Sequence, residues 1–203
     1  MKKSLSLFIT LCLLLVLFAF PTISFANVKD KELTVAFTHD LHSYIDTKEY
    51  NSNGRTIQVG GFAKIKSILD DIKASNENTL ILDGGDFSMG TLYQTVFTKK
   101  AIELRMLGLL GYDVVTLGNH EFDYGSAGLA RMLDSAMESG DPLPDIAISN
   151  IDWDNSSSDN AQKLKKSLNN YGVKDYVIIQ KNDIKVAVFG GMGIDADECA
   201  PNS

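Results

Sequence analysis

The sequence is poor in cysteine and in positive charge. It contains only two cysteines in 203 residues. Cys12 lies in an N-terminal apolar run that we expect to be removed, which leaves Cys199 alone and excludes an internal disulfide. The chain has 19 Lys and Arg against 26 Asp and Glu, a net charge of −7. This balance argues against nucleic-acid binding, which usually needs a basic face, and disfavours attraction to anionic lipid.

The sequence shows no internal repeat. Histidine is almost as sparse as cysteine. There are three histidines, His39, His42 and His120, and none follows His120. An acidic protein that binds an anionic substrate needs local positive charge at its site, and bound metal ions can supply it.

The first 26 residues are typical of an export signal. Lys2 and Lys3 precede a nearly unbroken apolar run, Leu5 to Phe20, and small residues at Ser24 and Ala26 suit a cleavage site. The alternative is an uncleaved anchor, but the run is shorter than the roughly 20 residues of a spanning helix. We expect cleavage after Ala26, a mature domain over residues 27–203, no stable membrane insertion, and a secreted, periplasmic or cell-wall-associated product.

Strand-like and helix-like segments alternate along the mature chain. Apolar runs predict strands at Leu33–Phe37, Thr79–Leu82, Asp113–Leu117 and Asp145–Ser149, and a hairpin formed by Tyr176–Ile179 and Ile184–Phe189. Three- and four-residue spacing predicts helices at 60–76, 98–110 and 126–138, and the polar segment 155–170 predicts a solvated loop and surface helix. Residues 38–56 are expected to be a polar loop. This alternation indicates an α/β fold, in which ligands gather beyond the carboxyl ends of the strands.

Three polar runs occupy that position. They are Asp40-Leu41-His42, Gly85-Asp86 and Gly118-Asn119-His120-Glu121, each following a predicted strand. Together they offer carboxylate, imidazole and amide groups, a set suited to two hard or borderline divalent metals.

The first two runs suggest metal ligands. Asp40 and His42 are two residues apart, which at a strand end puts both side chains on one side, so they can share one cation. Asp86 can bridge two metals about 3.5–4 Å apart. For each run alone, a surface loop or a capping Asp is the alternative. Asp83 precedes the turn and is expected to have a structural role. His39 is expected to be exposed to solvent or to contact the ligands without binding the metal itself.

The third run is the most specific. The carbonyl oxygen of Asn119 can complete a metal site without adding charge. His120 can donate to a phosphate oxygen or protonate a leaving group. Asp123 can hold that imidazole in one tautomer and keep it partly protonated. The alternative is a turn with a capping Asn.

The runs Thr38–His42, Leu82–Asp86 and Leu117–Asp123 resemble the successive motifs of calcineurin-like metallophosphoesterases, and most of all the bacterial 5′-nucleotidase and UDP-sugar hydrolase branch. The resemblance implies the N-terminal part of a two-sheet αββα sandwich. It also implies a metal-bound hydroxide that attacks the phosphate of a nucleotide or related phosphoester.

The same resemblance implies the role of each motif residue. Asp40 and His42 would bind one metal, Asp86 would bridge, and Asn119 would bind the second. His120 and Asp123 would form the catalytic pair. The metals would be two divalent ions, with Mn, Zn, Fe and Co as alternatives.

The resemblance further implies later histidines, in a Gly-His and a Gly-His-x-His motif, and a C-terminal nucleotide-binding domain. This sequence contains neither. We therefore expect an incomplete metallophosphoesterase domain with an incomplete second metal site and weak or no hydrolysis. The alternative is a non-catalytic remnant or a module that binds a single metal. Nucleoside monophosphates, UDP-sugars and cyclic nucleotides remain alternative substrates.

Overall fold

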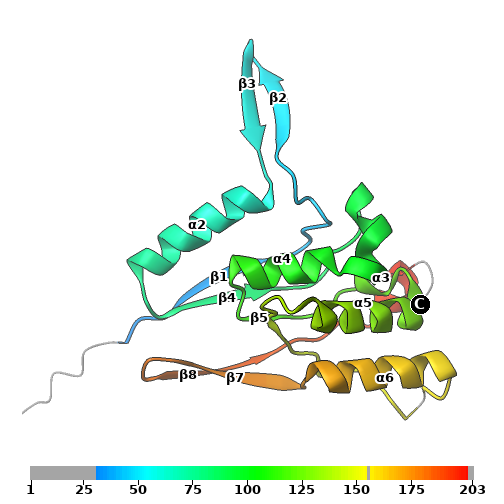
Figure 1. The fold of residues 1–203 in the computed structure, drawn as a ribbon. Coiled ribbons are helices and arrows are strands. Elements are labelled where there is room, and N and C mark those ends of the chain that lie inside the picture. The colour runs from blue at the N-terminus through cyan, green and yellow to red at the C-terminus, as the bar shows by residue number, and fades with distance from the viewer. Residues whose placement is uncertain (1–30, 155, 201–203) are drawn as a thin grey trace, which may run out of the picture. The chain divides into compact units, whose positions relative to one another are not determined.

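The computed structural model describes residues 31–154 and 156–200. From Glu32 onward these residues belong to one compact unit. The expected signal, residues 1–26, lies outside the described residues. The strands are β1 Thr34–Thr38, β2 Lys48–Ser52, β3 Arg55–Val59, β4 Thr79–Asp83, β5 Val114–Val115, β6 Asp145–Ile146, β7 Tyr176–Lys181 and β8 Ile184–Phe189 (Figure 1). The helices are α2 Phe62–Ser75, α3 Phe97–Lys100, α4 Ile102–Leu110, α5 Gly125–Ser139, α6 Asp159–Tyr171 and α7 Ala196–Cys199, with 3-10 turns η1 Leu92–Val96 and η2 His120–Phe122.

A parallel sheet with the order β1-β4-β5-β6 organises the fold. Thr34 lies opposite Thr79 and Leu82 opposite Val114. The α/β prediction is therefore confirmed. β5 and β6 are shorter than predicted, because only two residues of each form the regular hydrogen-bonding pattern of a strand. Single backbone hydrogen bonds, such as that from Ala147 N to Val115 O, continue the pairing by one residue.

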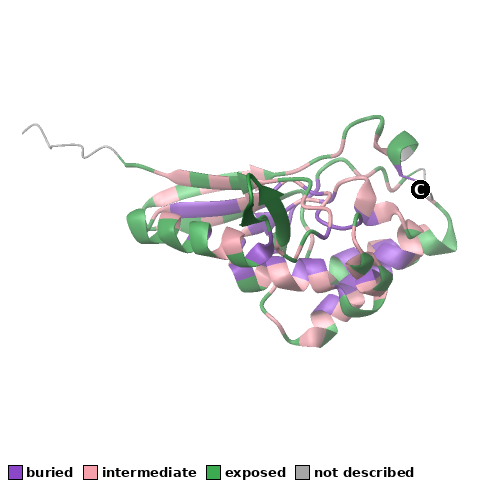
Figure 2. Ribbon diagram, turned by 90° about the horizontal axis from the view of Figure 1, so that it is seen from above, coloured by how far each residue is buried: buried purple, intermediate pink, exposed green. Residues whose placement is uncertain are grey.

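The sheet separates two apolar clusters, because successive residues of a strand point to opposite faces. Ile81, Val115 and Ile146 face the helices and join the larger cluster with side chains of α2, α4, α5 and α6. Their neighbours Leu82, Val114 and Ala147 face the opposite way, against Val177 and Val188 of the β7–β8 hairpin. Figure 2 shows the buried residues where helices and strands meet.

The edge strand β1 is less buried than its apolar run predicts. Val35 is 51% exposed and Phe37 59% exposed, while the side chains between them are partly covered. Phe189 of β8 is 75% exposed. One face of β1 is therefore exposed although its run is apolar, since the described part of the β7–β8 hairpin does not cover it.

The predicted polar loop 38–56 contains a hairpin that the sequence reading missed. β2 pairs with β3 in antiparallel register, and all their side chains are exposed, so neither face of the hairpin packs on the core. The signal was in the turn. Asn53 and Gly54 have φ of 52° and 75°, as the Asn-Gly pair of a two-residue hairpin turn requires. Figure 1 shows this hairpin standing away from the sheet.

The helix predictions hold with one break. α2, α5 and α6 match their predictions, and α6 packs on α5 through buried Leu164 and Leu168. The predicted helix 98–110 is divided at Ala101, whose φ of 46° ends α3 and starts α4. Of the helices in the described residues, none is both long enough and apolar enough to span a membrane.

Candidate metal centre

The three predicted runs meet at the carboxyl ends of β1, β4 and β5. The loop after β1 runs beside the loop after β4, with Asp40 N donating to Gly85 O (3.0 Å) and His42 N to Asp86 O (3.0 Å). Glycine is needed where the third loop approaches. A Cβ at Gly85 would lie 2.5 Å from Gly118 N, and a Cβ at Gly118 would collide with the Asp86 carboxylate. These glycines let the three loops come together.

His42, Asp86 and His120 form the centre of the site. One ligand atom from each lies within 4.8 Å of the others, and all three residues are half-buried. The rings of His42 and His120 are 5.0 Å apart between centroids, at an interplanar angle of 74°. Two imidazoles and one carboxylate suit borderline divalent metals such as Zn²⁺ and Mn²⁺, so the donor set fits the metal that the motifs imply.

The sequence reading assigned His120 to proton transfer and did not include it with the ligands. The structure brings its ring into the same cluster as His42 and Asp86, two of the predicted ligands. Its backbone N–H also donates to Asp86 Oδ1 at 2.9 Å. The position of His120 therefore suits either role.

Asp40 lies at the edge of this cluster. Its Oδ1 is 3.5 Å from His42 Nε2, and its Oδ2 contacts His39 Nδ1. The hydrogen bond and charge of Asp40 raise the pKa of His39, and the bond with His39 lowers the pKa of Asp40. His39 is thus an exposed partner of an expected ligand, consistent with the expected contact to a ligand. The other ring nitrogen of His42, Nδ1, is 3.2 Å from Met89 O, which leaves Nε2 directed toward Asp40.

Asn119 has a contact that the sequence could not indicate. Its Nδ2 donates to the backbone oxygen of Cys199, in α7, at 3.3 Å. The amide is thereby oriented by a segment far along the chain. The metal-binding role of Asn119 stays a prediction.

His120 and Asp123 pair as predicted. His120 Nδ1 lies 3.2 and 3.1 Å from the two carboxylate oxygens of Asp123. Burial by itself lowers the pKa of His120, but the hydrogen bond and charge of Asp123 outweigh it, aided by the charges of Asp86 and Glu121, so that the pKa is raised. The imidazole is therefore oriented through Nδ1, and Asp123 favours its protonated form.

Glu121 is the structural residue that the sequence reading missed. It is fully buried, and Oε2 accepts from the backbone N–H groups of Asp86 (2.9 Å) and Gly118 (2.7 Å). Oε1 accepts from the N–H and hydroxyl of Ser88, at 3.1 and 2.8 Å. Burial raises the pKa of Glu121, and the hydrogen bonds from Gly118 and Ser88 oppose that rise. One carboxylate thus ties the second motif loop to the third. The sequence feature that could have indicated this role is a charged residue placed between His120 and the apolar Phe122.

Comparison with known proteins agrees with this geometry. Residues 33–191 match the family model described as calcineurin-like phosphoesterase. The chain belongs to this family. The resemblance drawn from the three motifs is therefore confirmed.

Related members of the calcineurin-like phosphoesterase family are nucleotidases. The chain is 38% identical over 107 residues to the 5′-nucleotidase of Rattus norvegicus, an alignment that covers 51% of this chain and 18% of the rat protein. It superposes on the 5′-nucleotidase precursor of Thermus thermophilus with a TM-score of 0.67 and 26% identity, over 84% of this chain and 30% of that one. For the NAD nucleotidase of Haemophilus influenzae the values are 0.63 and 29%, over 82% and 30%. The chain therefore spans less than a third of the length of these proteins.

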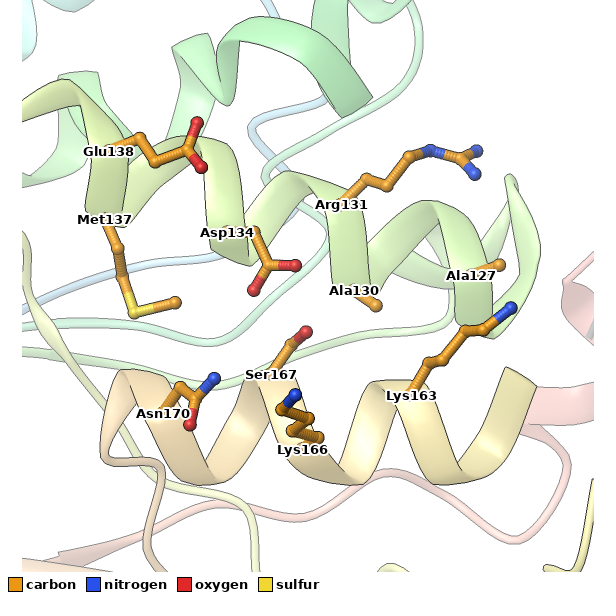
Figure 3. A pocket seen from close by; sticks show the side chains of 10 residues that line it. All are labelled: Ala127, Ala130, Arg131, Asp134, Met137, Glu138, Lys163, Lys166, Ser167 and Asn170. Carbon is orange, nitrogen blue, oxygen red and sulfur yellow. The ribbon is translucent and has the colours of Figure 1, made fainter. Parts of the chain in front are cut away.

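A second hollow lies away from the family motifs, between α5 and α6 (Figure 3). This groove of about 730 Å³ is lined by Arg131, Lys163 and Lys166 together with Asp134. Asp134 points toward Ser167 across the groove in Figure 3. Its mixed charges favour neither an anion nor a cation, and it contains none of the clustered metal-ligating groups. The metal centre is therefore the better candidate for the chemistry.

Proposed function

We propose that this chain carries the metal-binding motifs of an exported phosphoester hydrolase of the 5′-nucleotidase type. The observation that carries the proposal is the convergence of His42, Asp86 and His120 from three separate loops at one edge of the sheet. The names of the relatives support a nucleotide as the substrate class. Export rests on the character of residues 1–26.

In this proposal Asp40 and His42 would hold one divalent cation, Asp86 would bind both cations, and Asn119 would bind the second. Bound cations of this kind neutralise phosphate charge and lower the pKa of a water molecule. The negative charge of Asp86 and Asp40 alone would repel a phosphate, so the anionic substrate and the metal depend on each other.

His120 acts on the phosphate side of the reaction. Its Nδ1 is engaged by Asp123, so Nε2 is the atom that donates a proton or hydrogen bond to a phosphate oxygen. Asp123 keeps the imidazole oriented and favours its protonated form. Hydrogen-bond donors placed where charge develops are a large source of rate enhancement.

A module that binds a single metal is the second candidate, because the three clustered ligand atoms surround one point. Calorimetric titration with Mn²⁺ or Zn²⁺ separates the two by stoichiometry. Two ions per chain support the hydrolase site, and one ion supports the single-metal module.

The same titration tests the site. We expect His42→Ala and Asp86→Ala to weaken binding at least about tenfold. Asp70→Asn is the control, because Asp70 pairs with Lys66 on the exposed face of α2. Phosphate release from AMP, measured alongside, is expected to be weak at most; where it occurs it must require metal and must fall at least about tenfold in His120→Ala. Absence of metal binding in the wild type, or release that survives chelation, would contradict the proposal.

A further inference from the structure

The backbone of the first motif adopts an unfavourable conformation. Asp40, His42 and Ser43 have φ of 54°, 47° and 55°, in the left-handed region that residues with a Cβ rarely enter. Such residues persist only where their surroundings over-determine them, and they concentrate at functional sites. The contacts that hold this run therefore bear on the site.

One set of contacts comes from the neighbouring loop. The N–H groups of Asp40, His42 and Ser43 donate to the backbone oxygens of three successive residues, 85 to 87, at 2.9 to 3.0 Å. These bonds align the two loops. For Ser43 they hold only the backbone N–H group, and its hydroxyl and backbone oxygen are held by other contacts.

The other set of contacts holds Ser43 from α4 and from Thr91, the residue before η1. Ser43 is fully buried, and its hydroxyl donates to Glu103 Oε1 at 2.7 Å. Its backbone oxygen accepts from the hydroxyl of Thr91 at 2.8 Å. Glu103 is the second residue of α4, two positions after the left-handed Ala101 at which α4 starts. In this position its carboxylate contacts the loop of the first motif.

Glu103 is a costly residue at this position. It is fully buried, burial raises its pKa, and no donor among the described residues reaches its Oε2. An apolar side chain would fill the same space without the cost of a desolvated carboxyl group. Residues that oppose local stability and persist are expected where function requires them.

We propose that Glu103 is a positioning residue of the metal centre, which acts through Ser43 to keep His42 in the backbone conformation that turns its imidazole toward Asp86 and His120. The proposal rests on the proposed function only in treating this cluster as a metal site. Glu103 touches neither metal nor substrate in this role.

The test compares Glu103→Leu, which removes the acceptor, with Glu103→Gln, which keeps an acceptor for Ser43. Because the chain has only three histidines, the ring signals of His42 can be followed individually by NMR in the metal-free protein. We expect Glu103→Leu to shift the His42 signals, leave those of His39 in place, and weaken Zn²⁺ binding about tenfold or more. The melting temperature should change little, because removal of the desolvated carboxyl group offsets the acceptor lost by the Ser43 hydroxyl, and Glu103→Gln should restore both readouts.

Asp141→Asn is the matched control. Asp141 accepts from Arg105, on the same helix as Glu103, at 2.7 Å, and its loss should change neither the His42 signals nor Zn²⁺ affinity. If Glu103→Leu does not fold, Ser43→Ala removes the same hydrogen bond with a smaller change and should shift His42 alike. Unchanged His42 signals in these variants overturn the inference. If the wild type binds no Zn²⁺, the proposed function fails, and the His42 signals alone decide the role of Glu103.

Discussion

Replacing Asp83 by asparagine should change how stability depends on pH. Asp83 ends β4 and is 3% exposed. Its Oδ2 accepts from the hydroxyl of Thr38 at 2.6 Å, and its Oδ1 from Gly85 N at 3.0 Å. Burial raises its pKa from 3.8 to about 7, although both hydrogen bonds lower it. Asparagine has the same shape, carries no charge, and can still accept from Gly85 and donate to Thr38.

The sign follows from the two states. At pH values between 3.8 and about 7, the unfolded chain has released the Asp83 proton and the folded chain retains it. Raising the pH through this window therefore destabilises the folded state, and the loss is complete above the folded pKa. One pH unit corresponds to about 1.4 kcal/mol, so the two units from about pH 5 to the folded pKa amount to roughly 2.7 kcal/mol.

Urea unfolding at about pH 5 and about pH 8.5 measures this quantity, with wild type and Asp83→Asn compared at each pH. We expect the variant to gain roughly 2–3 kcal/mol relative to wild type between the two conditions. Other titrating groups, including His120, are present in both proteins and cancel in the comparison. A relative gain below about 0.5 kcal/mol would refute the reasoning and mean that water reaches the Asp83 carboxyl group freely.

Two further substitutions test how the loops of the metal centre are held together. Glu121→Gln leaves one acceptor oxygen for four donors, so two buried donors lose their partner. We expect the free energy of unfolding, measured in urea, to fall by about 2–4 kcal/mol. A fall below about 0.5 kcal/mol would contradict this. Gly118→Ala places a Cβ against the carboxylate of Asp86 and 2.7 Å from the backbone nitrogen of Asp86. It should destabilise the fold by about 1–3 kcal/mol and weaken metal binding, which calorimetry measures. A folded variant that binds metal with wild-type affinity would disprove the close approach.

Much of the fold was predictable because periodicity is a local property. The apolar spacing of α2 and α5 located both helices, and the pairing of β7 with β8 in a hairpin was identified. The β2–β3 hairpin was missed because its exposed strands bury no apolar face. The break at Ala101 was missed because alanine is a good helix former, so nothing in the local sequence marks its left-handed conformation.

The sequence by itself determined the family, the α/β class, and which residue types stand at the ends of β1, β4 and β5. Only the tertiary structure decided which atoms meet there. His120 lies with His42 and Asp86, and Glu121 and Glu103 support loops 35 and 60 positions away in sequence. Such contacts follow from how parallel strands bring distant loops to one edge and from what burial demands of each carboxylate. Neither leaves a pattern in neighbouring residues.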